Sequence, residues 1–419
     1  MRKCTALLLV LAWAGLGTAA DEPPTDWIDP ATGHRVLRLS REPGTASLYF
    51  HQNAYTADGD KMLVTTRDGL ATIDLTTLGV KPPKIEKIAD GRAFAPVVGK
   101  KTRQAFYVRS GSVYATHLDT HVTREIAKLP PGLSGASGLA INADETLLAS
   151  SGYDPKAREL AKPEELQGRR RSMCLFTIDI KTGAIKKFLY GLHWFNHTQF
   201  SPTDPTLVLF CHEGTWQDVD RIWTVRTDGT GLRLMHRRTM PLEIAGHEFF
   251  SPDGKMIWYD LQTPRSGEFW LAGVTVETGE RIRYPIERAH WSVHYNQSYD
   301  GKLFAGDGGG PNSVANRSPD NKRLDPPGNG QWIYLFRPRD EKPATIQVGG
   351  ETVKVGRLDV ERLVDLSRHD YRLEPNVRFT PDNKWVVFRS NMHGPTHVYA
   401  VEIKKGAGQK KGGPALRIE

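Results

Sequence analysis

The chain lacks most of the features that mark membrane, nucleotide-binding and serine hydrolase proteins. Beyond the N-terminus, no apolar run approaches the ~20 residues that a membrane-spanning helix needs. Neither a Walker phosphate-binding loop nor a dinucleotide-binding glycine pattern is present. The stretch GLSGASG around Ser134 has Ala136 where a nucleophile elbow needs glycine. The sequence therefore predicts no membrane span and disfavours these nucleotide-binding and hydrolase classes.

Cysteine is also scarce, since the 419 residues hold three. Cys4 falls in the N-terminal segment described below, so Cys174 and Cys211 are the thiols left to consider. Their spacing fits no zinc knuckle. In an oxidising compartment the two either form one disulfide or stay buried as free thiols, and the sequence leaves both open.

Charge is modest and positive, with a formal net charge of +8 at pH 7. No recognition helix or aromatic and basic motif accompanies it, so we expect no nucleic acid partner. The excess either favours a polyanion such as an anionic lipid or an acidic polysaccharide, or is solubilising charge spread over the surface. No feature of the sequence fixes the oligomeric state.

The two ends of the chain differ from its middle. Residues 1–20 place two basic residues before an apolar run that finishes in small residues, which is typical of a secretory signal peptide. We therefore expect export to the periplasm or the extracellular space. Residues 404–419 carry the lysine-rich stretch KKGAGQKKGG and are predicted to be a basic flexible tail. The folded domain is expected over residues 21–403.

A repeated pattern fills that domain. An Asp-centred turn followed by an alternating apolar strand recurs in YTADGDKMLVTT, INADETLLASS, FSPTDPTLVLFC, FSPDGKMIWYD, QSYDGKLFAGD and FTPDNKWVVFRS. A looser copy is VVGKKTRQAFYVRSG. The copies lie about 42 to 49 residues apart, apart from two longer intervals of about 60 and 82 residues, which is the spacing of propeller blades with two insertions.

Further strands ending in Gly and Asp turns lie between the copies. The sequence therefore predicts an all-β protein, a seven-bladed β-propeller with four-stranded antiparallel blades. A short helix is expected over residues 156–168 in the first insertion, and a surface loop over residues 308–327 in the second.

Polar side chains recur at one position of the repeat, five residues before the turn proline or its equivalent. Because a strand has a period of two, equivalent positions share an orientation and should converge near the propeller axis. Three of them are histidines, which favours a binding or catalytic site over a channel that merely holds water. The positions are Gln52, Gly138, His197, His247, His294 and Asn376.

Other candidate groups lie nearby. The segment FCHEGTWQDVDRIW contributes His212, Glu213 and Arg221. Glu374 and Asn376 are two residues apart, so they share a face if their segment is extended. With His294 they would supply one nitrogen and two oxygen donors, a set that suits Mn or Ca better than structural Zn.

These segments resemble the oligogalacturonate lyases, seven-bladed propellers that cleave short pectin fragments by β-elimination. The resemblance covers most of the chain and is most specific in NHTQFSPTDPTLVLFCHEGTW, HEFFSPDG and HYNQSYDGKLFAGDG. It implies that His247 is the general base, that Arg221 engages the substrate carboxylate and that His294 is a ligand of a Mn site.

The last blade departs from the family pattern. The family has a histidine-proline-histidine run before the last turn, where this chain has Glu374, Pro375 and Asn376, and the family's glutamine ligand falls on Tyr371. We expect His294, Glu374 and Asn376 to hold a divalent cation, Mn by resemblance or else Ca. Because they lie on strands around the same mouth, Gln52, His197 and His212 are predicted to contact substrate.

The chemistry explains these residue types. Elimination removes the C5 proton of a uronate, for which a neutral histidine is a suitable base. Charge that develops on the carboxylate is stabilised by an arginine or a cation. The sequence thus predicts a polysaccharide lyase acting on acidic oligosaccharides. The alternatives are a catalytically silent propeller that binds such sugars or a protein partner, and a different carbohydrate enzyme such as a hydrolase.

Overall fold

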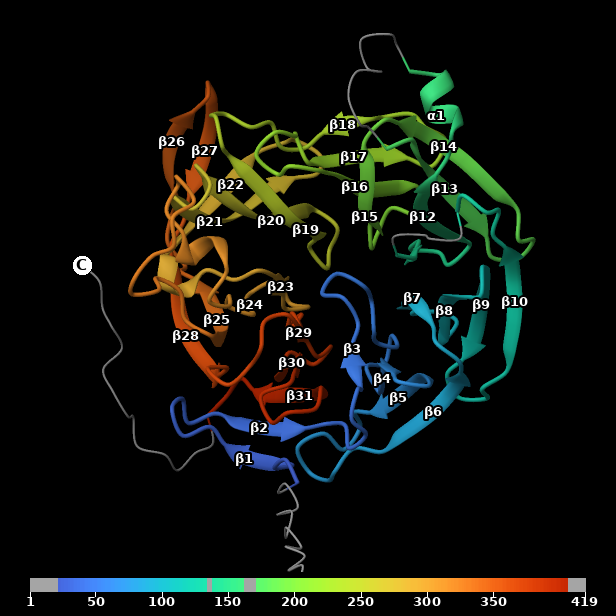
Figure 1. The fold of residues 1–419 in the computed structure, drawn as a ribbon, viewed down its shortest axis with the longest axis horizontal. Coiled ribbons are helices and arrows are strands. Elements are labelled where there is room, and N and C mark those ends of the chain that lie inside the picture. The colour runs from blue at the N-terminus through green and yellow to red at the C-terminus, as the bar shows by residue number, and fades with distance from the viewer. Residues whose placement is uncertain (1–21, 134–137, 162–170, 406–419) are drawn as a thin grey trace, which may run out of the picture.

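Seven β-sheets surround a central axis in the structure, a computed structural model (Figure 1). It describes residues 22–133, 138–161 and 171–405. The predicted all-β propeller with seven four-stranded antiparallel blades is confirmed, because each sheet contains a four-stranded antiparallel unit whose first strand lies nearest the axis. The predicted signal peptide and nearly all of the predicted tail lie outside the described residues.

Blades 1 to 4 follow the chain in order, each from its inner to its outer strand. Blade 1 consists of β3 (Ala46–Ser47), β4 (Lys61–Thr66), β5 (Gly69–Asp74) and β6 (Ile85–Asp90). Blade 2 consists of β7 (Phe94–Val98), β8 (Gln104–Arg109), β9 (Ser112–His117) and β10 (Thr123–Lys128). Blade 3 consists of β11 (Ala140–Ile141), β12 (Leu147–Tyr153), β13 (Met173–Asp179) and β14 (Ile185–Gly191). Blade 4 consists of β15 (Trp194–Phe200), β16 (Leu207–Glu213), β17 (Ile222–Arg226) and β18 (Arg233–Leu234).

The last three blades carry additions to this plan. Blade 5 consists of β19 (Ile244–Phe250), β20 (Met256–Thr263), β21 (Glu268–Thr275) and β22 (Arg281–Ile286), followed by β27 (Glu351–Val355) and β26 (Ala344–Val348). Blade 6 consists of β23 (Tyr295–Gln297), β24 (Phe304–Gly306), β25 (Trp332–Pro338) and β28 (Leu358–Asp365). Blade 7 consists of β29 (Arg378–Phe379), β30 (Trp385–Ser390), β31 (His397–Glu402), β2 (Arg35–Arg38) and β1 (Asp26–Ile28).

The repeated Asp-centred turn connects the first two strands of a blade. In blade 5, Ser251 Oγ donates to Asp253 Oδ1 at 2.6 Å, and the same carboxylate oxygen accepts from the Lys255 backbone N–H at 3.1 Å. Gly254 adopts φ +71°, a conformation that favours glycine. The equivalent hydroxyl-to-carboxylate bonds of blades 6 and 7 are also 2.6 Å long. The repeat therefore marks one hairpin with a fixed set of hydrogen bonds.

The ring closes where the two ends of the domain meet. Strand β2 pairs antiparallel with β31, and the Cα partners include Val36 with Val401 and Arg38 with Tyr399. Three C-terminal strands and two N-terminal strands thus share blade 7. Because the outer strand comes from the opposite end of the chain, the closure fixes the first and last blades to each other.

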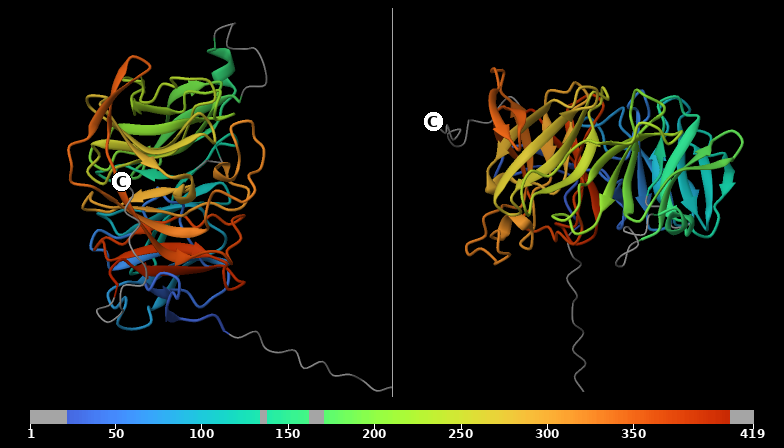
Figure 2. Two further views of the ribbon diagram at one scale, coloured as in Figure 1. Left: turned by 90° about the vertical axis from the view of Figure 1, so that its left-hand side faces the viewer. Right: turned by 90° about the horizontal axis from the view of Figure 1, so that it is seen from above.

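The helix expected over residues 156–168 is shorter among the described residues, and its positions 162–168 lie outside them. Helix α1 (Lys156–Glu159) is one turn long and lies at the rim of the ring (Figure 2). The second insertion holds the 3-10 helix η3 (Val314–Asn316), whose Ala315 and Asn316 are buried, so residues 308–327 are not merely a surface loop. Another 3-10 helix, η2 (Arg288–His290), precedes blade 6.

A further part of the second insertion was not predicted. The hairpin of β26 and β27 leaves blade 6 and adds to the outer edge of blade 5, where β27 runs parallel to β22 (Figure 1). It covers an edge strand that would otherwise present unpaired backbone groups. The side chains of this hairpin are mostly exposed, so the sequence does not indicate which blade the hairpin joins.

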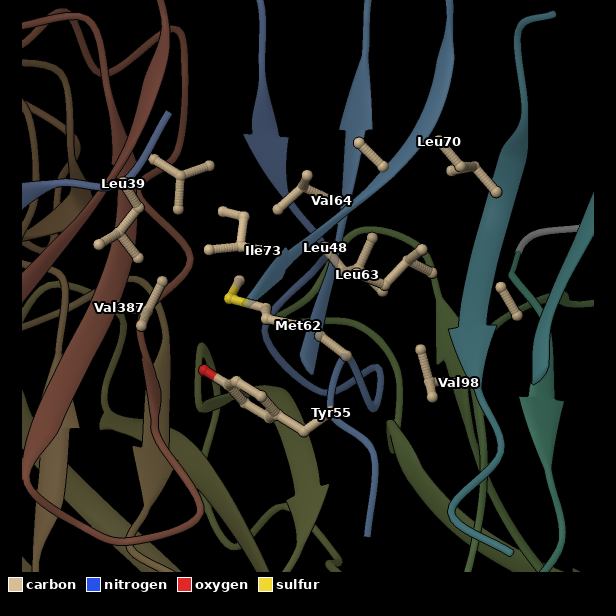
Figure 3. Packing of buried hydrophobic residues seen from close by; sticks show 14 of the residues in the cluster. Leu39, Leu48, Tyr55, Met62, Leu63, Val64, Leu70, Ile73, Val98 and Val387 are labelled. Carbon is tan, nitrogen blue, oxygen red and sulfur yellow. The ribbon is translucent and has the colours of Figure 1, made fainter. Parts of the chain in front are cut away.

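Apolar side chains fill the spaces between neighbouring blades. One such cluster joins Met62, Leu63 and Val64 of β4 to Val387 of β30 and Val98 of β7 (Figure 3). It therefore links blade 1 to both of its neighbours. Burial of this kind is the main stabilising term of the fold.

The two open questions about thiols and membrane spans are answered by the described residues. Cys174 and Cys211 are both buried and both free, so no disulfide joins them. None of the helices in the described ranges has the length and apolar character needed to cross a bilayer.

Candidate active site at the start of the inner strands

A local distortion aims two of the histidines at the axis. His197 and His247 adopt φ +49° and +51°, and the strand register shifts around each of them. Such a shift is a β-bulge, which leaves one residue unpaired and redirects its side chain. Histidine is among the residues that tolerate this left-handed conformation. The bulge lies in the middle of β15 (Trp194–Phe200) and of β19 (Ile244–Phe250). We call the end of the channel at which these inner strands begin the entrance face.

The structure brings the three predicted histidines together. The ring centroids of His247 and His294 lie 4.7 Å apart, and those of His197 and His247 lie 6.1 Å apart. The segment between β3 and β4 reaches toward the axis and places Phe50 against them, 4.8 Å from the His294 ring (Figure 1). Tyr49 from the same segment lies 5.4 Å from the His197 ring.

His294 has the arrangement of a preorganised metal ligand. Its Nδ1 lies 2.8 Å from Asp307 Oδ2, and both residues are fully buried. A carboxylate on one ring nitrogen fixes the tautomer and leaves the other nitrogen as an acceptor. That nitrogen, Nε2, is buried without a hydrogen-bond partner and lies 3.7 Å from Glu374 Oε2.

Glu374 and Asn376 do not play equivalent parts. The Glu374 side chain is 44% exposed and is free to face the entrance. Asn376 is fully buried; its Oδ1 accepts from the Phe50 backbone N–H at 2.9 Å and its Nδ2 donates to the Glu374 carbonyl at 3.1 Å. Because its amide is committed to the backbone, Asn376 acts as a structural residue here, which does not fit its predicted role as a metal ligand.

Arg221 lies beneath the entrance rather than open to it. The side chain is 2% exposed, and its guanidinium donates to Glu213 Oε1 at 2.6 Å and to Glu248 Oε2 at 2.9 Å. Burial works against the charged form, but the carboxylates of Glu248 and Glu213 outweigh it and raise the pKa of Arg221. The predicted direct clamp on a substrate carboxylate does not fit this position, because Glu213 occupies the guanidinium.

Glu248 joins Arg221 to the histidines. It is fully buried, and its Oε1 lies 3.1 Å from His197 Nδ1. Burial alone would raise the pKa of Glu248, but Arg221 and His197 together hold it well below the usual range. The carboxylate therefore stays ionised and positions His197.

A second group of metal-type donors also occurs here. One nitrogen of His197, the thiol of Cys211 and one oxygen of Glu248 lie within 4.8 Å of one another. The Glu248 carboxylate already accepts from Arg221, and burial raises the pKa of the Cys211 thiol well above its usual value. A positive guanidinium and a protonated thiol make these residues a poor cation site.

His247 carries the best geometry for a general base. The ring is half-buried; its Nδ1 is itself buried and has no hydrogen-bond partner among the described residues. Burial, and then the neighbouring His294, Arg221 and His197, hold the pKa of His247 well below its usual value near 6.5. The imidazole is therefore neutral at neutral pH and able to accept a proton.

Gln52 lies elsewhere than predicted. It lines a cavity of about 230 Å³ at the other end of the channel, among the turns that end the inner strands, together with Lys100 and Tyr299. Strand β3 ends at Ser47, so residue 52 belongs to the turn that follows it and not to an inner strand. The register count itself holds, since Tyr55 pairs with Met62 as Phe250 pairs with Ile257. The chain at Gln52 is a turn in blade 1, whereas His247 lies within a strand of blade 5.

His212 is also turned away from the site. Its ring stacks on His193 at 4.4 Å and on Trp223 at 5.0 Å. Burial and the neighbouring His193 lower the pKa of His212 to about 3. Cys211 and Glu213 face Arg221, and alternation along β16 sends the residue between them to the other face. The structure thus gives no support to substrate contact by His212.

Three residues at this site were not identified from the sequence. Glu248 immediately follows His247 in HEF, and Asp307 lies in the run GDGGG, so each was within a recognised motif. Trp216 lies in the loop after β16, with its ring 6.4 Å from that of His247. Glu248 and Asp307 are buried carboxylates that pair with histidines, and the strand pattern alone does not reveal such pairs.

Comparison with known proteins agrees with this geometry. The model of the oligogalacturonate lyase family matches residues 25–407. An oligogalacturonide lyase of Pectobacterium atrosepticum is 26% identical over 394 residues, which cover 90% of this chain and 95% of that protein. An oligogalacturonate lyase of Dickeya dadantii is 27% identical over 390 residues with the same coverage.

Solved structures show the same fold. An oligogalacturonate lyase in complex with manganese has a TM-score of 0.70 at 22% identity, covering 91% of this chain and 96% of the other. An oligogalacturonate lyase from Vibrio parahaemolyticus has a TM-score of 0.70 at 20% identity, with the same coverage. Because the family model spans almost the whole described chain, the protein belongs to the oligogalacturonate lyase family and is a lyase.

Proposed function

We propose that the protein cleaves short oligogalacturonides, or related uronate oligosaccharides, by β-elimination, with His247 as the general base. The observation that carries the proposal is the neutral, half-buried His247 ring at the entrance face, next to the ring of His294. Membership of the family supports the substrate class.

The reaction follows from this placement. His247 accepts the C5 proton of a uronate residue, the electron pair of the C5–H bond forms the C4=C5 double bond, and the C4–O bond breaks. The released oxygen takes a proton from water. The product carries an unsaturated uronate at its new end, which a hydrolase would not form.

The charge of the site favours a cation. Glu213, Glu248, Asp307 and Glu374 supply four carboxylates around the histidines. Two guanidinium groups offset part of this negative charge. Arg221 donates to Glu213 and Glu248, and Arg389 donates to the backbone carbonyl of Glu374. An anionic sugar would be repelled by the remaining negative charge unless a cation accompanied it.

The residues present fit such a cation with two protein donors. His294 Nε2 and the Glu374 carboxylate face the same place, and Asp307 orients the imidazole. An imidazole next to a carboxylate suits Mn better than Ca, which prefers oxygen ligands throughout. When bound, the ion would neutralise the uronate carboxylate and stabilise the charge that develops when the C5 proton leaves.

Arg221 has a positioning role in this proposal. It holds Glu248 against His197, and its positive charge helps to keep His247 unprotonated. A cation held by His294 and Glu374 would supply the positive charge that the substrate carboxylate needs.

The test is ultraviolet absorbance of the purified protein with di- and trigalacturonate, with and without added Mn or Ca, because elimination alone creates a conjugated uronate. We expect absorbance to rise with Mn. His247→Ala should lower the rate by a factor of about 10² to 10⁴, while His121→Asn, on a blade 2 turn with φ +58°, should not. A flat trace with sugar binding retained would instead identify a silent binding propeller.

We also propose that the protein is exported to the periplasm or the extracellular space. The support is the composition of residues 1–20. N-terminal sequencing of the protein recovered from outside the cytoplasm should find a chain that starts near residue 21. An intact Met1 on the mature protein would contradict export by a cleaved signal.

A further inference from the structure

Two exposed tryptophans, Trp194 and Trp216, both neighbour Glu213 at the entrance face. Trp194 is 36% exposed and Trp216 is 42% exposed, whereas large aromatic side chains elsewhere in the described blades are mostly buried. Both contact the surroundings of Glu213. Exposed aromatic rings beside a catalytic group are typical of sites that bind sugar rings, since the apolar face of a pyranose stacks on them.

Trp216 is held in place beside the proposed base. Its indole N–H donates to Glu213 Oε1 at 2.7 Å, and its ring lies 6.4 Å from the His247 ring. Glu213 is anchored in turn by Arg221. The orientation of the Trp216 ring is therefore fixed by a buried ion pair although the ring itself faces solvent.

Trp194 continues the same surface away from His247. It is the direct cross-strand partner of Glu213 in the pairing of β15 with β16, so the two side chains share a face of blade 4. The Arg171 guanidinium lies over the Trp194 ring, 4.2 Å from its centroid. Stacking fixes the plane of the guanidinium and leaves its N–H groups at the edge.

Arg171 has no counter-ion among residues 22–133, 138–161 and 171–405. It is exposed, and none of the ion pairs among the described residues includes it. An arginine whose plane is fixed by stacking is suited to bind a carboxylate through two parallel hydrogen bonds. Trp216 beside His247, Trp194 beside Glu213 and Arg171 over Trp194 thus supply two exposed aromatic rings and a cation around Glu213.

We propose that Trp216, Trp194 and Arg171 form a subsite for the uronate residue next to the one that His247 deprotonates. Trp216 and Trp194 support the sugar rings, and Arg171 binds the carboxylate of the neighbouring residue. The inference rests on the proposed lyase function and adds a reason for selectivity: the site recognises two consecutive acidic residues, not one.

The test measures binding rather than turnover. In a His247→Ala background, calorimetric titration with digalacturonate and with monomeric galacturonate, both with Mn, compares Arg171→Gln and Trp194→Ala with the parent. The control is Arg226→Gln, which removes the same charge at the far end of the same blade, where Arg226 pairs with Asp204.

We expect Arg171→Gln and Trp194→Ala each to weaken digalacturonate binding roughly tenfold, the effect of about 1.4 kcal/mol, and to leave galacturonate binding unchanged. The control should change neither. Equal loss for both sugars, or no loss for either, would overturn the subsite. Failure of the lyase proposal would show separately, as the absence of unsaturated product from the unmodified protein.

Discussion

If His247 is the general base, as we propose, it controls how the activity depends on pH. Its pKa is held below the usual 6.5 by burial and by His294, Arg221 and His197, with Glu248 acting in the opposite direction. The neutral ring is the active form, so a lower pKa moves its protonation to lower pH. We therefore expect kcat/KM for digalacturonate to stay level as pH falls through 6.5 and to decline only below it. An acidic decline centred at or above 6.5 would show that the base is another group.

Variants of Asn376 and Glu374 should distinguish a structural role from a role in cation binding. Asn376→Ala leaves the buried Phe50 backbone N–H without its acceptor and places alanine at φ +55°. The expected cost is about 1–3 kcal/mol of unfolding free energy, measured by urea denaturation. The cost should be the same with and without Mn, because the amide is not free to bind it.

The matched variant is Glu374→Gln, whose side chain is 44% exposed. It should change stability by less than about 0.5 kcal/mol but raise the Mn concentration needed for half-maximal activity. If Asn376→Ala mainly altered the Mn requirement and left the urea midpoint unchanged, Asn376 would be a cation ligand after all.

At the scale of strands, pattern reasoning succeeded where the strands are regular. The alternating apolar runs and Asp turns predicted the blades, and the shared register predicted that His197, His247 and His294 converge. It failed where local geometry departs from the repeat. β3 is two residues long and ends before Gln52, and the bulges that aim His197 and His247 leave no mark in the hydrophobic pattern.

Pairing between distant segments was also beyond the sequence. The hairpin of β26 and β27 has an exposed, polar sequence and joins blade 5 through a parallel pairing with β22. Likewise, the carboxylates around Arg221 come from separate strands, β16 and β19. Only tertiary structure shows that these charges compensate one another and thereby bury the arginine.

Closure by β2 gives a prediction at the same scale. Val36 is fully buried in the blade 7 cluster and pairs with Val401. Val36→Asp would bury an unpaired carboxylate, which should cost more than about 3 kcal/mol in urea unfolding. The control is Ile28→Asp in the neighbouring β1, where the side chain is 45% exposed; its cost should stay within about 0.5 kcal/mol. Equal effects would mean that β2 does not close the ring.

For the whole molecule, buried neutral histidines predict sensitivity to acid. Burial lowers the pKa of a set of histidines spread over the blades, so between their folded values and about 6.5 the unfolded chain binds more protons, and stability falls as pH falls. Asp260 acts in the opposite direction: burial raises its pKa to about 7, so the folded chain binds this proton more readily than the unfolded chain does. The histidines are His51, His212, His236, His247, His290, His369, His393 and His397.

We expect the urea midpoint to be lower at pH 5.5 than at pH 7, and lower again below about 4.5, where Glu243 and Glu248 lose contributions that depend on their ionisation. Calorimetry in buffers of different ionisation enthalpy should detect net proton uptake on unfolding at pH 5.5. Greater stability at pH 5.5 than at pH 7 would contradict this balance.

The shared seventh blade also sets the order of events during biosynthesis. The partner of β2 is β31, at the other end of the domain. At roughly 5–20 residues per second, the ribosome finishes β31 roughly 20 to 70 seconds after β2 has emerged. Until then one edge of the nascent ring has no partner, so the molecule stays open while most of it is made. The proposed export fits this delay, since an open chain passes through a translocation channel more readily than a closed ring.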